Sequence, residues 1–201
     1  MFLSDTDILA EVKAGHITLD PFNEKQLQPA TYDIKLGNTF IINDAHSTKA
    51  IDPAKGVYPQ TQTIEVLDGE EFVLHPGVSI LGYSKEKFGS DNYLIEVNGK
   101  SSLARIGLIV HNSASIVNPG HYLNIALELC NLNNVPIVLR PGMEIAQLSF
   151  STLSSHTKRN YKQTGRYSRN NFASYVPPKT GPLARKKSTK KTATKKAKKK
   201  I

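Results

Sequence analysis

The chain has one cysteine, no tryptophan and no long hydrophobic stretch among its 201 residues. A single cysteine, Cys130, excludes an intrachain disulfide and a zinc site built from several cysteines. The absence of a stretch of about 18 apolar residues excludes a membrane-spanning helix. The first residues, Met1-Phe-Leu-Ser-Asp-Thr-Asp7, lack the basic flank and apolar segment of a signal peptide. We therefore expect a cytoplasmic protein with no membrane contact.

Positive charge is concentrated at the end of the chain. The formal net charge is +9, but residues 185–201 contain ten Lys or Arg and no acid, which leaves −1 for residues 1–184. This segment has too little apolar surface to offset the cost of ordering, so we expect a disordered Lys-rich tail. Such a tail attracts nucleic acid without sequence preference. A solvated appendage with no partner is the alternative.

The pattern of the remaining residues predicts a mainly β fold after one short helix. Ser4 can cap a helix of about ten residues in which Asp7 is the third residue, and Gly15 can end it. From Ile17 to Phe150, short β-favouring segments alternate with Gly, Pro, Asn and Asp, without an alternating helical pattern. We expect about ten strands in a mainly antiparallel barrel or double-sheet sandwich, formed by a core domain of residues 1–157.

Three Pro-Gly pairs, at residues 76–77, 119–120 and 141–142, predict sharp corners in which glycine takes a positive φ. Between the second and third corners, leucine and isoleucine occupy every second position from Leu123 to Leu129. This period of two is typical of a strand with one buried face. Glu128 therefore points away from that face. A further strand is expected from about Met143 to about Leu153.

The segment Gly99-Lys-Ser-Ser-Leu-Ala-Arg105 has two interpretations. It can be a serine-capped short helix. It can also bind an anion through a helix N-terminus assisted by Lys100 and Arg105. The P-loop pattern of nucleotide triphosphatases is absent, and so is the zinc-deaminase pattern, so no metal ligand is predicted. Taken alone, Glu128 is an ordinary solvated carboxylate and His111 a structural histidine.

The sequence resembles the dCTP deaminase family of the trimeric dUTPase-like superfamily along residues 2–185. The segments that carry the resemblance follow the family's order: Leu3-Ser-Asp-Thr-Asp-Ile8, Gln28-Pro-Ala-Thr-Tyr-Asp-Ile-Lys-Leu-Gly37, Phe72-Val-Leu-His-Pro-Gly77, Gly99-Lys-Ser-Ser-Leu-Ala-Arg-Ile-Gly-Leu108, Val110-His-Asn-Ser-Ala114, Asn118-Pro-Gly120 and Ala126-Leu-Glu-Leu129. The resemblance implies distorted jelly-roll subunits in a homotrimer, with active sites between neighbouring subunits. The implied reaction is hydrolysis of dCTP to dUTP and ammonia without zinc, in pyrimidine deoxynucleotide biosynthesis.

The resemblance also implies roles for individual residues. Glu128 would be the general base and acid, Ser101 and the carbonyl of Ala114 would hold the attacking water, and Arg105 would orient the site. The implied substrate-binding residues are Lys100, Ser101, Ser102, Leu103, Ala104, Arg105, Asn118, Ala126, Leu127, Glu128, Tyr161, Arg166 and Asn170.

Lys100 and Ser102 would contact the triphosphate, and residues 158–184 would form a lid over the site. Arg166-Tyr-x-x-Asn170 matches the lid spacing of the family, and Ser174-Tyr175 is an alternative register. Mg²⁺ would arrive with the triphosphate and needs no dedicated protein cage.

The sequence departs from the family pattern in the lid, where Arg166 replaces lysine and Asn170 replaces glutamine, and near the second Pro-Gly corner. Asn118 stands where the family usually has aspartate, and His121-Tyr-Leu-Asn124 replaces the usual residues that follow the corner. An asparagine forms hydrogen bonds to a hydroxyl but takes no proton at neutral pH, so we expect dUTP rather than dUMP as the product. The alternatives are a bifunctional deaminase and diphosphatase, a plain dUTPase, and a weakly catalytic nucleotide-binding module with a nucleic-acid-binding tail.

Overall fold

The computed structural model describes residues 1–168. Asn170, the alternative lid pair Ser174-Tyr175 and the Lys-rich tail lie outside these residues.

The first element is α1 (Asp5–Lys13), in which the Ser4 hydroxyl accepts a hydrogen bond from the Asp7 amide and the Asp7 carboxylate accepts one from the Ser4 amide. This reciprocal cap satisfies two amides that have no partner within the helix. The predicted N-terminal helix is confirmed, and Gly15 follows it with a φ of 76°.

The strands that follow are short except for four of them. Their bounds are β1 (Ile17–Asp20), β2 (Leu27–Gln28), β3 (Thr31–Asn43), β4 (Thr61–Glu65), β5 (Phe72–Leu74), β6 (Ser79–Ser90), β7 (Tyr93–Gly99), β8 (Leu108–Ile109), β9 (Ile116–Val117), β10 (Leu123–Asn131), β11 (Ile137–Leu139) and β12 (Glu144–Thr152). The remaining helices are η1 (Glu24–Gln26), α2 (Ser101–Arg105) and α3 (Tyr161–Thr164). None of the helices in residues 1–168 is long and apolar enough to cross a membrane.

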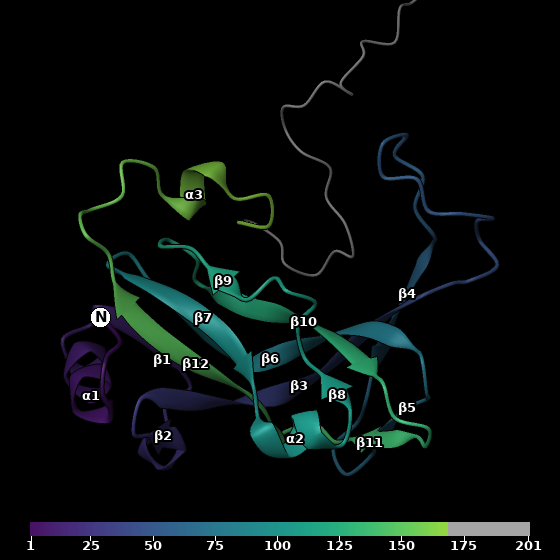
Figure 1. Ribbon diagram of the computed structural model, residues 1–201, viewed down its shortest axis with the longest axis horizontal. Helices are drawn as coiled ribbons and strands as arrows, with labels where there is room; N and C mark the ends of the chain where they lie inside the picture. Colours follow the sequence, from purple (N-terminus) through teal and green to yellow (C-terminus); the bar gives the residue numbers. More distant parts are fainter. Residues whose placement is uncertain (169–201) are drawn as a thin grey trace, which may run out of the picture.

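Ten of the strands form one curled sheet in which every pairing is antiparallel (Figure 1). Its order is β8-β10-β6-β3-β12-β7-β9, with β1 added to β6 and with β2 and β4 added to β3, while β5 and β11 form a separate pair. The long strand β3 pairs with β12 near its start and with β4 and β6 near its end. Because β3 pairs with β12 in one half of the sheet and with β4 and β6 in the other, the sheet closes over a single core. The predicted mainly antiparallel β fold is confirmed.

Large side chains from the long strands fill this core. Tyr32, Phe40, Phe88 and Phe150 are fully buried between the two halves of the sheet. Burial of such side chains is the main favourable contribution to folding. The predicted corners are also confirmed, because the glycines of all three Pro-Gly pairs have φ values between 72° and 91°.

Candidate active site

Glu128 lies on β10 and faces away from the core. Its neighbours Leu127 and Leu129 are 1% and 0% exposed, so the alternation of the strand directs the carboxylate to the opposite face. One carboxylate oxygen, Oε2, accepts a hydrogen bond from the amide of Asn112 at 3.2 Å. The predicted direction of Glu128 is therefore confirmed.

A pocket surrounds Glu128 and brings together several residues that the sequence predicted. Ala114, Asn118, Ala126 and Tyr161 line it together with Glu128. The other lining residues are Leu81, Ile116, Val117, His121, Ile125 and Tyr167. Most of these side chains are apolar, so the pocket suits an uncharged ring and sugar better than a triphosphate.

The turn between β8 and β9 brings a backbone amide to the Glu128 carboxylate. Ser113 has a φ of 64°, an uncommon conformation for a residue other than glycine. The amide of Asn112 on one side of it bonds Glu128, and Ala114 on the other side reaches the pocket. The carbonyl of Ser115 accepts from the Val97 amide at 2.8 Å and ties the turn to β7.

His121 forms part of the pocket wall and was identified from the sequence only as a departure from the family pattern. It is 4% exposed, with its ring centroid 6.0 Å from that of Phe88 and 5.6 Å from that of Tyr161. Burial lowers the pKa of His121, with a smaller opposing effect from the Phe88 carbonyl. The ring is therefore neutral at neutral pH, and Glu128 is the only charged group among the described residues that line the pocket.

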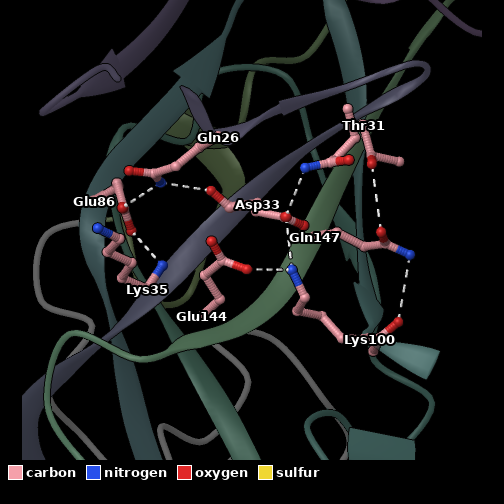
Figure 2. Close-up of polar contacts among 10 residues, drawn as sticks. Gln26, Thr31, Asp33, Lys35, Glu86, Lys100, Glu144 and Gln147 are labelled. Carbon is pink, nitrogen blue, oxygen red and sulfur yellow. Dashed lines mark hydrogen bonds and ion pairs between the residues drawn. The ribbon is translucent and has the colours of Figure 1, made fainter. Parts of the chain in front are cut away.

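Lys100, Ser101 and Ser102 line a second, more open depression beside Asp33 and Glu144. Figure 2 shows Lys100 between these two carboxylates, with Nζ 2.6 Å from Oδ2 of Asp33 and 2.7 Å from Oε2 of Glu144. Gln28 also donates to Oδ2 of Asp33 at 3.1 Å. The predicted phosphate-binding lysine is thus already held by two acids.

The same network continues into the core of the sheet (Figure 2). Nε2 of Gln26 donates to the Asp33 carbonyl at 2.7 Å and to the buried carboxylate of Glu86 at 3.0 Å. The amide of Lys35 donates to the other oxygen of Glu86 at 2.9 Å. Asp33 therefore belongs to a polar network that joins the β2 edge to β6, a role that its sequence neighbourhood did not reveal.

The charge of the second depression differs from the predicted one. Burial acts to lower the pKa of Lys100, but hydrogen bonds and ion pairs with Asp33 and Glu144 outweigh it and raise the pKa above the ordinary lysine value. One lysine and two carboxylates leave a net charge of −1. A triphosphate placed here needs either release of Lys100 or a counter-cation.

The helix α2 departs from the sequence prediction at its start. Its N-cap is Lys100, without any side-chain hydrogen bond, so the predicted serine cap is wrong. Leu103 packs against the core, while Ala104 and Arg105 are exposed and line neither of the two pockets.

Two further predicted substrate-binding residues also lie outside the pocket wall. Arg166 is exposed and does not line the Glu128 pocket, whereas its neighbour Tyr167 does. The side chain of Leu127 lies in the core, so only its backbone can contact a nucleotide.

Within one chain, the predicted site is divided between two places. Among the described residues, none lines both the Glu128 pocket and the Lys100 depression. In Figure 1, α2 lies at the lower edge of the molecule, whereas α3, which carries Tyr161, lies at the upper edge. Residues 1–168 contain no group of three or more His, Cys, Asp or Glu that could hold a metal ion.

Comparison with known proteins identifies the family. Residues 2–153 match the family described as dCTP deaminase-like. The chain belongs to this family. A relative from Beutenbergia cavernae, named dCTP deaminase, dUMP-forming, is 43% identical over 162 residues, which cover 80% of this chain and 84% of the relative. A relative of the same name from Mycobacterium tuberculosis strain H37Rv is 42% identical over 163 residues, which cover 80% and 85% of the two chains.

The structural comparison shows that this chain shares its fold with a solved dCTP deaminase. The solved structure of 2'-deoxycytidine 5'-triphosphate deaminase from Agrobacterium tumefaciens matches with a TM-score of 0.58 at 20% identity. The match covers 76% of this chain and 48% of that chain, so this protein spans about half the length of the Agrobacterium deaminase. Both sequence relatives are named as dUMP-forming, which differs from the dUTP product predicted from Asn118.

Proposed function

We propose that this protein deaminates dCTP with Glu128 as the general base and acid. The observation that carries the proposal is the position of Glu128, which projects from β10 into a largely apolar pocket with Ala114, Asn118 and Ala126. A carboxylate in such a pocket can take a proton from a bound water without a second charged group competing for it. The names of the relatives support dCTP as the substrate.

The proposed reaction has two proton transfers through Glu128. The carboxylate takes a proton from a bound water while the oxygen of this water bonds to C4 of cytosine. The carboxylate then passes the proton to N3 of the ring. It then takes the proton of the new hydroxyl and delivers it to the amine as the C4–N bond breaks, which leaves a C4 carbonyl and ammonia. The carbonyl of Ala114 would help hold the water. A base of this kind contributes roughly 10² to 10⁴ in rate.

We further propose that the complete site forms between copies of the chain in a homotrimer. The support is the division described above, because Ser101 and Glu128 lie in depressions with no common residue among those described. Ser101 and Arg105 of one copy would then face Glu128 of the next. Lys100 and Ser102 would contact the triphosphate, and Mg²⁺ bound to the phosphates would offset the negative charge of Asp33 and Glu144.

The proposed product is dUTP. Asn118 lines the pocket but its amide takes no proton at neutral pH, so it cannot activate a water for attack on the triphosphate. The competing product is dUMP, the one named for the relatives. Incubation with dCTP and Mg²⁺ should give dUTP without dUMP, and Asn118→Asp should allow dUMP to appear. Accumulation of dUMP by the unaltered chain at a rate comparable with deamination would refute this part.

Glu128→Gln tests the catalytic role. The variant should bind dCTP with similar affinity and lose at least about 10²-fold in kcat, because the amide cannot carry the proton. Glu65→Gln is the matched control, because Glu65 is an exposed carboxylate on β4. Near-normal turnover of Glu128→Gln would remove Glu128 from the mechanism. An equal loss of kcat in Glu65→Gln would show that the loss of a negative charge alone explains the effect.

Mixing two inactive variants tests the shared site. If Ser101 and Glu128 of different copies form one site, mixed trimers of Ser101→Ala and Glu128→Gln contain some sites with both original residues. Activity should then return after the two variants are unfolded and refolded together, but not after they are refolded separately and assayed as a mixture. No recovery in the co-refolded sample, with trimers present by light scattering, would contradict the shared site.

A further inference from the structure

Contacts among four residues hold the helix α3 against the sheet. Asn160 and Lys162 lie at the start of α3, and they contact Asp91 and Tyr122. We call these four residues the docking cluster. Nδ2 of Asn160 donates to Oδ1 of Asp91 at 2.7 Å. Nζ of Lys162 lies 3.5 Å from Oδ2 of Asp91 and 4.4 Å from the ring centroid of Tyr122. Asp91 belongs to the turn between β6 and β7, about seventy residues before α3 in the sequence. The cluster therefore joins two distant parts of the chain.

Backbone contacts at the Pro119–Gly120 corner support the same docking. The amide of Tyr161 donates to the Pro119 carbonyl at 2.9 Å, and the amide of Gly120 donates to the Ser90 carbonyl at 2.8 Å. A Cβ atom at Gly120 would lie 1.8 Å from Oδ1 of Asn160. Only glycine leaves room for Asn160 at this corner, so the corner is shaped to receive α3.

Asn160 is the central residue of the cluster. Its Oδ1 caps α3 by accepting from the Lys162 amide at 2.9 Å, while its Nδ2 bonds Asp91. The hydrogen bond from Asn160 is the main reason that the pKa of Asp91 lies below the ordinary value, with a smaller contribution from Lys162. Both contacts of Asp91 are exposed, but the Asn160 hydrogen bond is 2.7 Å long and the Lys162 ion pair 3.5 Å, so the Asn160 bond is the stronger contact.

The docking of α3 determines which side chains close the Glu128 pocket. Tyr161 follows Asn160 directly and its ring lies against His121. A Cβ atom at Gly165 would lie 2.4 Å from the ring of Tyr161, so only glycine fits at this position. The amide of Gly165 donates a hydrogen bond to the Tyr161 carbonyl at 2.7 Å. The chain thus turns back after α3, and Tyr167 reaches the pocket as well.

We propose that Asp91 is a positioning residue that holds the C-terminal segment in place, so that Tyr161 and Tyr167 complete the wall of the Glu128 pocket. Asp91 does not itself line the pocket. Its effect on catalysis rests on the proposed deaminase function, whereas its effect on the docking of α3 does not.

Limited proteolysis of the full chain tests the docking without any substrate. Asp91→Ala should speed tryptic cleavage after Lys158, Arg159 and Lys162 by roughly fivefold, the change expected from the loss of one exposed, charge-assisted hydrogen bond. Mass spectrometry locates these cuts among those in the tail. Asp68→Ala is the control, because Asp68 is an exposed acid between β4 and β5. Cleavage of Asp91→Ala at the rates of the control would overturn the proposal.

An exchange of the two side chains separates docking from general destabilisation. Asp91→Asn with Asn160→Asp again pairs an amide with a carboxylate, and aspartate is as good an N-cap as asparagine. This double variant should recover slow cleavage, while Asp91→Ala should keep the melting temperature of the unaltered chain. A double variant as sensitive as Asp91→Ala, or a matching fall in melting temperature, would overturn the proposal.

Kinetics then test the consequence for the site. Asp91→Ala should raise KM for dCTP several-fold and leave kcat at saturation nearly unchanged, and the exchanged pair should restore KM. Faster proteolysis with unchanged KM would overturn the link to the pocket. If the protein deaminates no dCTP at all, the proposed function fails, while the proteolysis result still decides the docking.

Discussion

Replacement of Lys100 with methionine removes the only cation that lies between Asp33 and Glu144 among the described residues. Methionine keeps most of the length and apolar stem of lysine, so the main loss is the charge. The two ion pairs have very different surroundings. The Asp33 side chain is 4% exposed, whereas that of Glu144 is 48% exposed and that of Lys100 is 19% exposed. The energetic cost should therefore come almost entirely from Asp33.

The magnitude follows from what remains around Asp33. Without Lys100, Oδ2 keeps only the hydrogen bond from Gln28, and Oδ1 is already buried without a partner. Removal of one member of a buried ion pair typically costs about 3–5 kcal/mol because it leaves a buried charge uncompensated. Loss of an exposed pair costs about 1 kcal/mol or less. We expect Lys100→Met to lower the free energy of unfolding by about 3 kcal/mol and Glu144→Gln by less than about 1 kcal/mol.

Urea denaturation at one fixed protein concentration measures these differences, and a double variant sharpens the test. In Lys100→Met with Asp33→Asn, the charge of Asp33 is removed together with that of Lys100, so Asp33 no longer leaves an uncompensated charge and the double variant should be more stable than Lys100→Met alone. Equal costs for Lys100→Met and Glu144→Gln would refute the reasoning, as would a double variant less stable than the single one. If Lys100→Met instead raises KM for dCTP without loss of stability, Lys100 serves the triphosphate rather than the fold.

Two further predictions concern the wall of the Glu128 pocket. Because burial lowers the folded-state pKa of His121 below its ordinary value of 6.5, the unfolded chain takes up the proton first as pH falls, and stability declines below about pH 6.5 by at most about 1.4 kcal/mol per pH unit. His121→Phe should flatten this decline in denaturation measured between pH 5 and pH 7, and equal slopes would contradict it. Gly89→Ala should destabilise by at least about 1–3 kcal/mol, because a Cβ there would lie 1.6 Å from the His121 carbonyl oxygen. Gly99→Ala is the control, with its nearest contact at 3.6 Å, and a similar melting temperature for both variants would contradict the prediction.

Local patterns were sufficient to predict the features that depend on neighbouring residues in the chain. Ser4 and Asp7 are three residues apart and cap each other, so α1 follows from the sequence alone. The direction of Glu128 follows from the alternation along β10, even though the register between β10 and β6 shifts between Asn124 and Ala126. Glycine at the Pro-Gly corners was equally predictable, because the positive φ is a local requirement.

Predictions about the site succeeded less well where distant residues compete. Ser101 did not become the cap of α2, because the chain enters that helix through Lys100, which is held by Asp33 and Glu144 from other strands. The partners of Lys100, Asp33 and Glu144, lie 67 and 44 residues away in the sequence, so no local pattern predicts these ion pairs. Likewise, the contribution of Tyr167 to the Glu128 pocket depends on how α3 docks.

The sequence by itself therefore determined the class of fold, the family and the face of β10 from which Glu128 projects, since these depend on short-range spacing and on an ordered set of motifs. Only the tertiary structure decided that Lys100, Ser101 and Ser102 line a depression separate from the Glu128 pocket, and that Lys100 pairs with two acids. The physical reason is that charge and burial at a site are sums over every element packed around it. The curled sheet brings those elements together from positions far apart in the chain.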